Sequence, residues 1–202
     1  MKKVCILDYG SGNVKSVYNL VRFLGFDVII SNKKNDIEDS THIILPGVGS
    51  FGGSIKKIKS KIPIKCLEKE ILENKKPFLG ICVGMQVIFE FGYEYGRHEG
   101  LNWIKGNVKK LIVEDLPLPH MGWNNIEIKK EDKIFFGLDE INDFYFIHSY
   151  AVDTNQNYIL SETEYGSRFC SAIKKDNIYG VQFHPEKSQK TGQKLLKNFL
   201  NI

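Results

Sequence analysis

Cys82 is the residue whose neighbours most clearly predict covalent chemistry, because one glycine lies two residues before it and another two residues after it. The apolar run 77–79 predicts a buried strand, and the run from Val83 to Phe89 predicts a helix. Strand, sharp turn and helix form the pattern of a nucleophile elbow, with sulfur in place of oxygen. The glycines permit its strained backbone, and a helix N-terminus favours thiolate. An ordinary turn with a buried, unreactive thiol would fit the same residues.

His184 and Glu186 could supply the base and the carboxylate that orients it. They flank Pro185 at the end of a predicted strand, 178–183. The proline restricts the backbone, and a base with its orienting group needs such fixed geometry. Taken alone, the pair would equally fit a solvated histidine beside a chance glutamate.

The loop 46–53 could supply the oxyanion donors that acyl transfer requires. It holds four glycines and a proline and directly follows a predicted strand, 42–45. Its backbone N–H groups would then lie at the carboxyl end of a strand, where α/β sheets bind ligands. An ordinary turn into the next helix is the alternative. Together with Cys82, His184 and Glu186, the loop completes the parts of an acyl-transfer site that works through a thioester.

The remaining histidines and cysteines have simpler interpretations. No two of them have the spacing of zinc ligands, so we expect neither a metal nor a cofactor. We expect His42 to begin a strand, His98 to lie in a loop, and His120 and His148 to satisfy local hydrogen bonds. The remaining cysteines are expected to be inert core thiols: Cys5, Cys66 and Cys170.

The hydrophobic pattern predicts an α/β fold of one domain, residues 1–202, with a mostly parallel central sheet flanked by helices. The opening is predicted as β-α-β-β, with strands at 4–7, 26–30, 42–45 and 77–81, and helices at 14–24 and 55–72, the latter broken at Pro63. Further strands, antiparallel on the flank of the same sheet, are predicted at 103–113, 124–128, 144–148, 157–161, 168–174 and 178–183, before a helix at 193–200. The glycine-rich turn 8–13 lacks a nucleotide-binding pattern.

Composition excludes several functional classes. The 202 residues are 42% hydrophobic and 26% charged, and the net charge of +4 comes from scattered lysines, so we expect no nucleic-acid partner. No apolar run approaches the roughly 20 residues that span a bilayer. The first apolar stretch is too short for a signal peptide, and the four cysteines show no disulfide framework. We therefore expect a cytoplasmic protein with reduced thiols and no membrane partner.

Six motifs, spread over nearly the whole chain, carry a family resemblance: residues 8–13, 45–52, 80–86, 119–124, 148–150 and 180–189. With them the chain resembles the class I, triad-type glutamine amidotransferases. Among these it is most similar to the glutaminase subunits of imidazole glycerol phosphate synthases.

The resemblance implies a mechanism that agrees with the one inferred from the residues. Cys82 would attack the side-chain amide of L-glutamine, His184 would move the protons, and Glu186 would hold the imidazole tautomer. The residues implied for the oxyanion hole are Val48, Gly49 and Val83. The peptide at Val48 would turn into place only when a partner carries its own substrate.

The resemblance also implies how the substrate and the partner are bound. The residues implied to hold glutamine are Gly47, Gln86, Glu94, Ser149 and Tyr150. The partner would be a (β/α)8-barrel cyclase subunit, contacted by Met121 and Trp123, which receives ammonia through an internal channel and makes imidazole glycerol phosphate and an aminoimidazole carboxamide ribotide. Enclosed transfer has a chemical reason, because free ammonia at neutral pH is mostly ammonium, which is not nucleophilic.

Two alternatives remain open from the sequence. A paralogous glutaminase could supply ammonia to a sugar amidotransferase of surface-glycan synthesis. A catalytically silent regulatory subunit could have retained the fold, although the full set of nucleophile, base and orienting group argues against this.

Overall fold

The computed structural model describes residues 2–138 and 142–202. Parallel strands form one side of the main sheet, from its edge strand inward, in the spatial order β2-β1-β3-β4-β14. Their bounds are β1 (Lys3–Leu7), β2 (Asp27–Ser31), β3 (His42–Gly47), β4 (Phe78–Cys82) and β14 (Ile178–Val181). Every residue of β3, β4 and β14 is buried, as their continuous apolar runs predict for a sheet covered on both faces.

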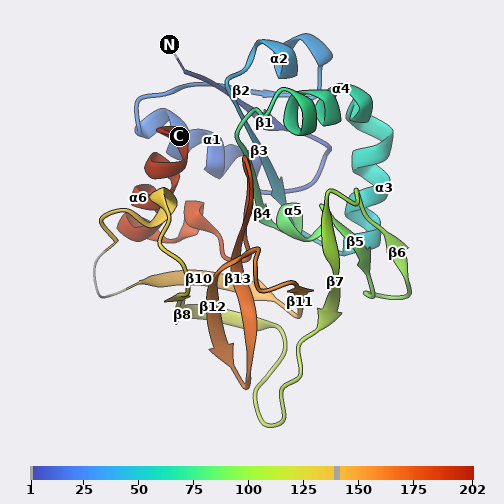
Figure 1. Ribbon diagram of the computed structural model, residues 1–202, viewed down its shortest axis with the longest axis vertical. Helices are drawn as coiled ribbons and strands as arrows, with labels where there is room; N and C mark the ends of the chain where they lie inside the picture. Colours follow the sequence, from blue (N-terminus) through green and yellow to red (C-terminus); the bar gives the residue numbers. More distant parts are fainter. Residues whose placement is uncertain (1, 139–141) are drawn as a thin grey trace.

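Helices cover both sides of these strands. Figure 1 shows α1 (Val14–Phe23) and α6 (Gln189–Leu200) on one side, and α3 (Phe51–Lys61) with α4 (Ile64–Glu68) on the other. A π-helical turn, η1 (Lys69–Glu73), extends α4, and Pro63 separates α3 from α4 as predicted. The predicted β-α-β-β opening is wrong, because α2 (Lys34–Asp39) lies between β2 and β3. This short helix buries a single apolar residue, Ile37, and so leaves almost no periodic signal.

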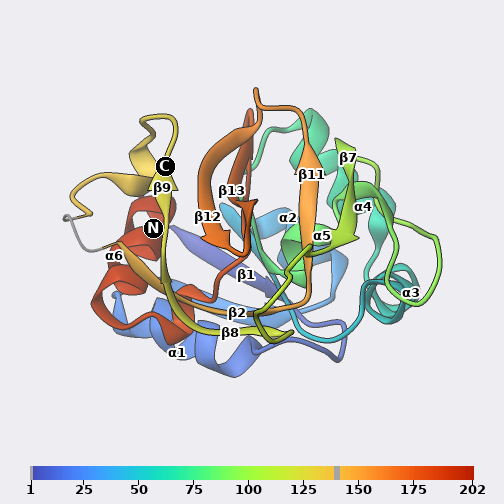
Figure 2. The same ribbon diagram turned by 90° about the horizontal axis from the view of Figure 1, so that it is seen from below.

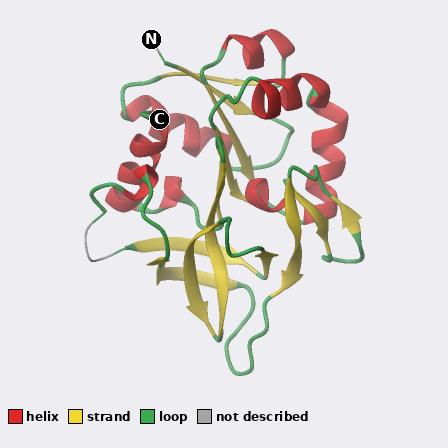
Figure 3. Ribbon diagram, in the orientation of Figure 1, coloured by secondary structure: helices red, strands yellow, loops and turns green. Residues whose placement is uncertain are grey.

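The C-terminal half continues the sheet mostly with antiparallel pairs, as predicted, but the strand predicted at 178–183, β14, is wrong in direction on one side because it pairs in parallel with β4. The order beyond β14 is β13 (Ser167–Lys175), β11 (Tyr150–Thr154), β7 (Ile104–Lys110), β5 (Phe89–Gly92) and β6 (His98–Glu99). A further strand, β12 (Ile159–Tyr165), pairs with β13 and with β9 (Glu127–Ile128). Figure 3 shows the resulting division, with helices gathered around one half of the molecule and strands making up most of the other.

Two strands leave this sheet and pair only with each other. These are β8 (His120–Asn125) and β10 (Asp143–His148), so the prediction that all these strands extend one sheet is wrong for them. Figure 2 shows β8 running across the direction of β11 and β13. The separation has a packing reason: Phe144 and Phe146 of β10 are fully buried, and Phe144 stacks on Phe183 with ring centroids 3.9 Å apart.

The predicted helix from Val83 to Phe89 is also wrong in length. Only a single turn, α5 (Val83–Gln86), is helical, and Phe89 begins β5. Val87, Ile88 and Phe89 are β-branched or aromatic and fully buried, and the parallel pairing of β5 with β7 fixes the backbone of Phe89 in the sheet.

The thiols outside the elbow differ in exposure. Cys5 and Cys170 are buried, and burial raises the pKa of Cys5 to about 12 and that of Cys170 above its usual range. Cys66 is only half-buried, on α4, so the expectation of a core thiol is wrong there. His98 lies in the short strand β6 rather than in the expected loop.

Candidate active site

The elbow presents Cys82 in a conformation that few non-glycine residues adopt. Its φ is 54° and its ψ is −113°, at the end of β4 and directly before α5. The turn is packed tightly, against β3 and against itself. A Cβ added to Gly84 would lie 1.9 Å from the carbonyl oxygen of Leu45, and one added to Gly80 would lie 2.5 Å from the oxygen of Gly84. The flanking glycines are therefore required by this close approach.

His184 and Glu186 form the closest polar pair beside the elbow. The Nδ1 atom of His184 lies 2.8 Å from Oε1 of Glu186, and both side chains are about 1% exposed. A carboxylate can only accept, so Nδ1 carries the proton and Nε2 is left for the reaction. Burial disfavours the imidazolium, but Cys82 and the Glu186 carboxylate outweigh it and raise the pKa of His184 to about 10. This electrostatic arrangement favours the imidazolium form of His184.

The loop 8–13 contacts two parts of the site. The sequence did not predict these contacts. The Nδ2 atom of Asn13 donates to Oε1 of Glu186 at 3.2 Å, the same oxygen that accepts from His184. The hydroxyl of Ser11 donates to the carbonyl oxygen of Val48 at 2.9 Å. The loop had a family motif as its only signal, because nothing in its residue types indicates these partners.

A pocket of about 190 Å³ brings most of the predicted site residues together. Its volume is below the roughly 300–1,000 Å³ of drug-sized ligand sites and suits a small metabolite. The predicted residues that line it are Val48, Gly49, Cys82, Val83, Gln86, Glu94, Ser149, Tyr150 and His184; the others are Ile147, His148 and Lys187. Gly47 is absent from the lining, so the structure does not place it with the other predicted glutamine-binding residues. A Cβ there would lie 2.4 Å from the nitrogen of Gly84, and Gly47 instead supports the elbow.

Two lining side chains are held by hydrogen bonds within the protein. The Nε2 atom of Gln86 donates to the carbonyl oxygen of Tyr150 and to Oε1 of Gln182, both at 2.9 Å. The Oε2 atom of Glu94 accepts from the backbone nitrogen of Phe51 at 2.8 Å, where α3 begins. The carboxylate of Glu94 and the remaining amide oxygen of Gln86 are suited to an ammonium group, and backbone N–H groups in the pocket wall are suited to a carboxylate.

The comparison with protein families decides among the classes that could use this arrangement. The model of the family "Glutamine amidotransferase class-I" matches residues 5–202. The chain belongs to the class-I glutamine amidotransferase family. This confirms the family and the enzyme class predicted from the motifs.

This amidotransferase has full-length relatives. It is 41% identical over 200 residues to imidazole glycerol phosphate synthase subunit HisH 1 of Campylobacter jejuni, covering 98% of this chain and 100% of that protein. It is 43% identical to subunit HisH of Aquifex aeolicus, with 98% and 95% covered. It is 44% identical to subunit HisH 2 of Methanococcus maripaludis, with 98% of each chain covered.

Solved structures share the fold of this amidotransferase at low sequence identity. A putative GMP synthase subunit from Thermoplasma acidophilum aligns with a TM-score of 0.72 at 21% identity, over 100% of this chain and 93% of that one. PurLQS from Thermotoga maritima aligns with a TM-score of 0.75 at 18% identity, over 99% and 98% of the two chains. They confirm the predicted α/β fold.

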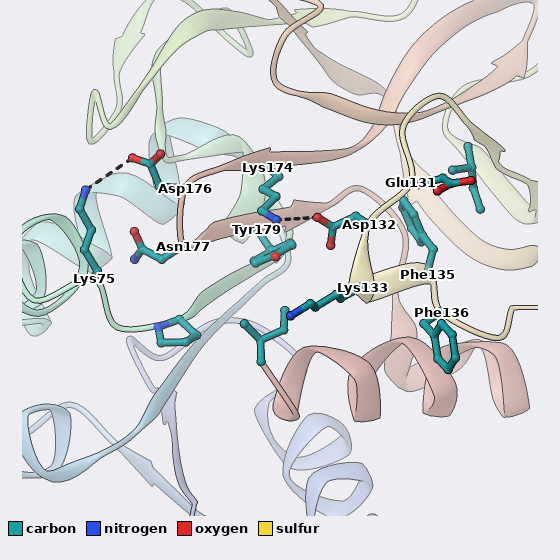
Figure 4. Close-up of a pocket in the computed structure, with 13 residues that line it drawn as sticks. Lys75, Glu131, Asp132, Lys133, Phe135, Phe136, Lys174, Asp176, Asn177 and Tyr179 are labelled. Carbon is teal, nitrogen blue, oxygen red and sulfur yellow. Dashed lines mark hydrogen bonds and ion pairs between the residues drawn. The ribbon is translucent and has the colours of Figure 1, made fainter.

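The amidotransferase has a second, larger cavity of about 940 Å³ away from Cys82 (Figure 4). Its lining includes Pro77 and Asn177, which directly precede β4 and β14, whereas Cys82 and His184 lie at or beyond the carboxyl ends of these strands. It is therefore at the opposite end of the sheet. Its lysines are partly neutralised, because Lys174 pairs with an aspartate at 2.5 Å, and it holds none of the predicted site residues.

The predicted interface residues of the amidotransferase lie on β8 with exposed side chains. Met121 is 59% exposed and Trp123 is 48% exposed, and the indole ring packs edge-on against Tyr145. Within residues 2–138 and 142–202, no group of three or more histidine, cysteine or acidic side chains could hold a metal ion. None of the helices described in those ranges is both long enough and apolar enough to cross a membrane.

Proposed function

We propose that the protein is the glutaminase subunit of an imidazole glycerol phosphate synthase and hydrolyses L-glutamine to glutamate and ammonia. The observation that carries this proposal is the presence of Cys82, at an elbow, in one pocket with His184, whose imidazole is fixed by Glu186. The HisH names of the full-length relatives support the choice of synthase. We propose that residues 1–202 act as one catalytic domain.

The first half of the reaction forms a thioester. The sulfur of Cys82 attacks the side-chain amide carbon of glutamine, and the carbonyl oxygen gains the negative charge. The backbone N–H of Val83 and one N–H from the Val48–Gly49 segment stabilise that oxygen. Protonated His184 gives its Nε2 proton to the leaving nitrogen, so that ammonia departs and the glutamyl group remains on sulfur.

The second half restores the enzyme. Neutral His184 takes a proton from water, which attacks the thioester carbon, and the proton then passes to the sulfur as glutamate forms. Glu186 keeps the imidazole in the tautomer that both halves require. The amino-acid head of glutamine is held by Glu94 and by the Gln86 side chain with the Ser149–Tyr150 backbone, all of which line the pocket.

We further propose that ammonia passes to a (β/α)8-barrel cyclase subunit, which uses it to make imidazole glycerol phosphate and aminoimidazole carboxamide ribotide. The exposed Met121 and Trp123 on β8 are suited to that interface, because aromatic and methionine side chains are enriched at interface cores. The surface-glycan alternative is not supported by the relatives named above, which are all called HisH.

Replacement of Cys82 by alanine tests the chemistry. In the complex with the cyclase subunit, Cys82→Ala is expected to abolish glutamine-dependent synthesis, while synthesis from added ammonium salt continues. The matched control is Cys66→Ala, a half-buried thiol outside the pocket, which is expected to keep both activities. Persistent glutaminase activity in Cys82→Ala would overturn the mechanism. Failure of the native gene to rescue a histidine auxotroph that lacks this subunit would overturn the choice of synthase alone.

A further inference from the structure

A chain of polar groups connects β8 to the sulfur of Cys82. We call it the polar network: the side chains of Asn124, His120, His148, Gln86 and Gln182, with the carbonyl of Tyr150. From β8 inward, Asn124 Nδ2 lies 3.3 Å from His120 Nε2, and His120 Nδ1 lies 3.2 Å from His148 Nε2. The carbonyl oxygen of Tyr150 lies 2.9 Å from His148 Nδ1 and 2.9 Å from Gln86 Nε2. Gln86 Nε2 lies 2.9 Å from Gln182 Oε1, and Gln182 Nε2 lies 3.6 Å from Cys82 Sγ.

The β8 end of the polar network sets the direction of its hydrogen bonds. The Oδ1 atom of Asn124 accepts from the backbone nitrogen of Asn125 at 2.8 Å, and its Nδ2 donates to the carbonyl oxygen of Glu164 at 2.9 Å. These two bonds fix which way the amide points, so Nδ2 faces His120 as a donor. Nε2 of neutral His120 must then be an acceptor, and its Nδ1 must carry the proton.

The tautomer of His148 is set independently and gives the same direction of hydrogen bonding. The Nδ1 atom of His148 faces a carbonyl oxygen, which can only accept, so this nitrogen also carries a proton. Its Nε2 is left to accept the proton of His120 Nδ1. Both histidines are therefore expected in the Nδ1–H tautomer, and the two constraints, which come from opposite sides of the pair, agree.

The other half of the polar network ends on the nucleophile. The two hydrogens of Gln86 Nε2 are both used, one on the carbonyl of Tyr150 and one on Gln182 Oε1. The orientation of Gln182 is fixed by that bond, and its Nε2 points to the sulfur as a donor. A donor at this place stabilises negative charge on sulfur.

Burial makes the polar network costly to break. Gln182 is 0% exposed, and His120, His148 and Gln86 are exposed by 6% or less, so water cannot replace a lost partner. Burial lowers the pKa of His120 to about 4 and that of His148 to about 3, which keeps both neutral at physiological pH. His120 also stacks on Tyr165, with ring centroids 4.0 Å apart.

We propose that the polar network is a second support for the nucleophile, separate from the His184–Glu186 pair. In it Gln182 donates to the Cys82 thiolate, and His120 and His148 are positioning residues that tie this donor to β8. The proposal rests on the proposed function, because it assigns a role in the same site. It also gives a physical connection between the buried face of β8, the strand that carries Met121 and Trp123 on its other face, and the reactive sulfur.

The tautomers test the proposal in the native chain. ¹⁵N-labelled full-length protein is observed by two-bond nitrogen–proton correlation NMR near pH 7. Both His120 and His148 are expected to show the pattern of a neutral ring protonated on Nδ1, whereas neutral imidazole in water favours Nε2. A ring of either residue protonated on Nε2 would contradict the direction derived above and overturn the proposal. This readout requires no folded variant and no substrate.

The donor role is tested by the rate at which iodoacetamide alkylates Cys82 at pH 7, measured by peptide mass spectrometry. Cys66 in the same sample is the reference thiol, since it is half-buried and outside the pocket. Gln182→Met is expected to slow alkylation of Cys82 about tenfold, the effect of losing one hydrogen bond to a charged acceptor. Ser161→Ala removes another buried hydrogen bond and should leave the ratio unchanged.

The positioning role is tested at the far end with two replacements of His120. His120→Phe keeps an aromatic ring but loses the donor, and is expected to slow the alkylation of Cys82 about threefold. His120→Asn can place an N–H where Nδ1 lies and should restore most of the rate. An unchanged rate in both Gln182→Met and His120→Phe, with each variant folded by thermal unfolding, would overturn the proposal. Since alkylation needs neither glutamine nor a partner, failure of the proposed function would leave these results interpretable.

Discussion

Replacement of Glu186 by glutamine removes one charge from the site with little change of shape. The Oε1 atom of Glu186 accepts from His184 Nδ1 at 2.8 Å and from Asn13 Nδ2 at 3.2 Å. An amide oxygen can accept both bonds, so Glu186→Gln is expected to keep the imidazole ring and its tautomer in place. What it removes is the negative charge, and with about 1% of either side chain exposed, water cannot compensate.

The expected size of the effect of Glu186→Gln follows from the electrostatics of His184. The pKa of His184 is raised to about 10 because Cys82 and Glu186 outweigh the opposing effect of burial. A hydrogen bond to a charged group is worth about 1 kcal/mol more than a neutral one, which corresponds to about one pKa unit. Loss of the charge lowers the pKa of His184, so the imidazolium loses its proton at a lower pH.

The lowered pKa of His184 changes the pH dependence of glutamine hydrolysis in a defined direction. Thioester formation needs the imidazolium as proton donor, so kcat/KM for glutamine in the native complex is expected to fall as pH rises through about 10. In Glu186→Gln that alkaline limb is expected to move down by about one unit, so that kcat/KM changes little near pH 8 and is about tenfold lower than in the native complex near pH 11.

The assay is glutamine hydrolysis by the complex between pH 6 and pH 11, with buffers of constant ionic strength. Asp132→Asn is the matched control, since it neutralises another largely buried carboxylate at the opposite end of the sheet, in the larger cavity. It should not move the limb. An alkaline limb at the same pH in native enzyme and Glu186→Gln would refute the electrostatic role given to this carboxylate.

Three further perturbations have expected outcomes. Gly84→Ala would place a Cβ 1.9 Å from a carbonyl oxygen of β3, and is expected to cost about 3 kcal/mol of unfolding free energy in urea titration and to slow glutamine hydrolysis. Lys76→Met leaves the largely buried Glu70 without its cationic partner at 2.9 Å, with only the Asn74 amide still donating to it, and should cost about 3 kcal/mol by the same titration. Trp123→Ala should weaken binding to the cyclase by at least tenfold in calorimetry, without slowing Cys82 alkylation. The control Phe136→Ala, at another exposed aromatic residue, should leave binding to the cyclase unchanged.

The central sheet could be predicted from the sequence because its signal is local. The apolar runs at β1, β3 and β4 are buried on almost every residue, and a continuous apolar run of that length has few other uses. The separate pairing of β8 with β10 could not be predicted in this way. Alternation along a strand indicates which face is buried, but it does not indicate which other strand supplies the hydrogen bonds.

The candidate site divides along the same line. The elbow at Cys82 and the His184-Pro185-Glu186 segment are short patterns whose geometry follows from a few neighbouring residues. The contact of Asn13 with Glu186 spans 173 positions, and that of Gln182 with Cys82 spans 100. An asparagine or glutamine can donate or accept almost anywhere, so only the assembled fold shows what each one holds.

The register between β4 and β14 explains how one sheet can support the nucleophile from two sides. Ile81 pairs with Val181, so Gln182, the residue directly after β14, lies beside Cys82 at the end of β4, and His184 comes two residues later. The register is fixed by close packing, because a Cβ on Gly180 would lie 2.4 Å from a side-chain carbon of Met85 at the elbow. A slip of one residue would bring an apolar side chain to the sulfur and turn the base away. The placement of both supports beside the elbow therefore follows from a single strand pairing.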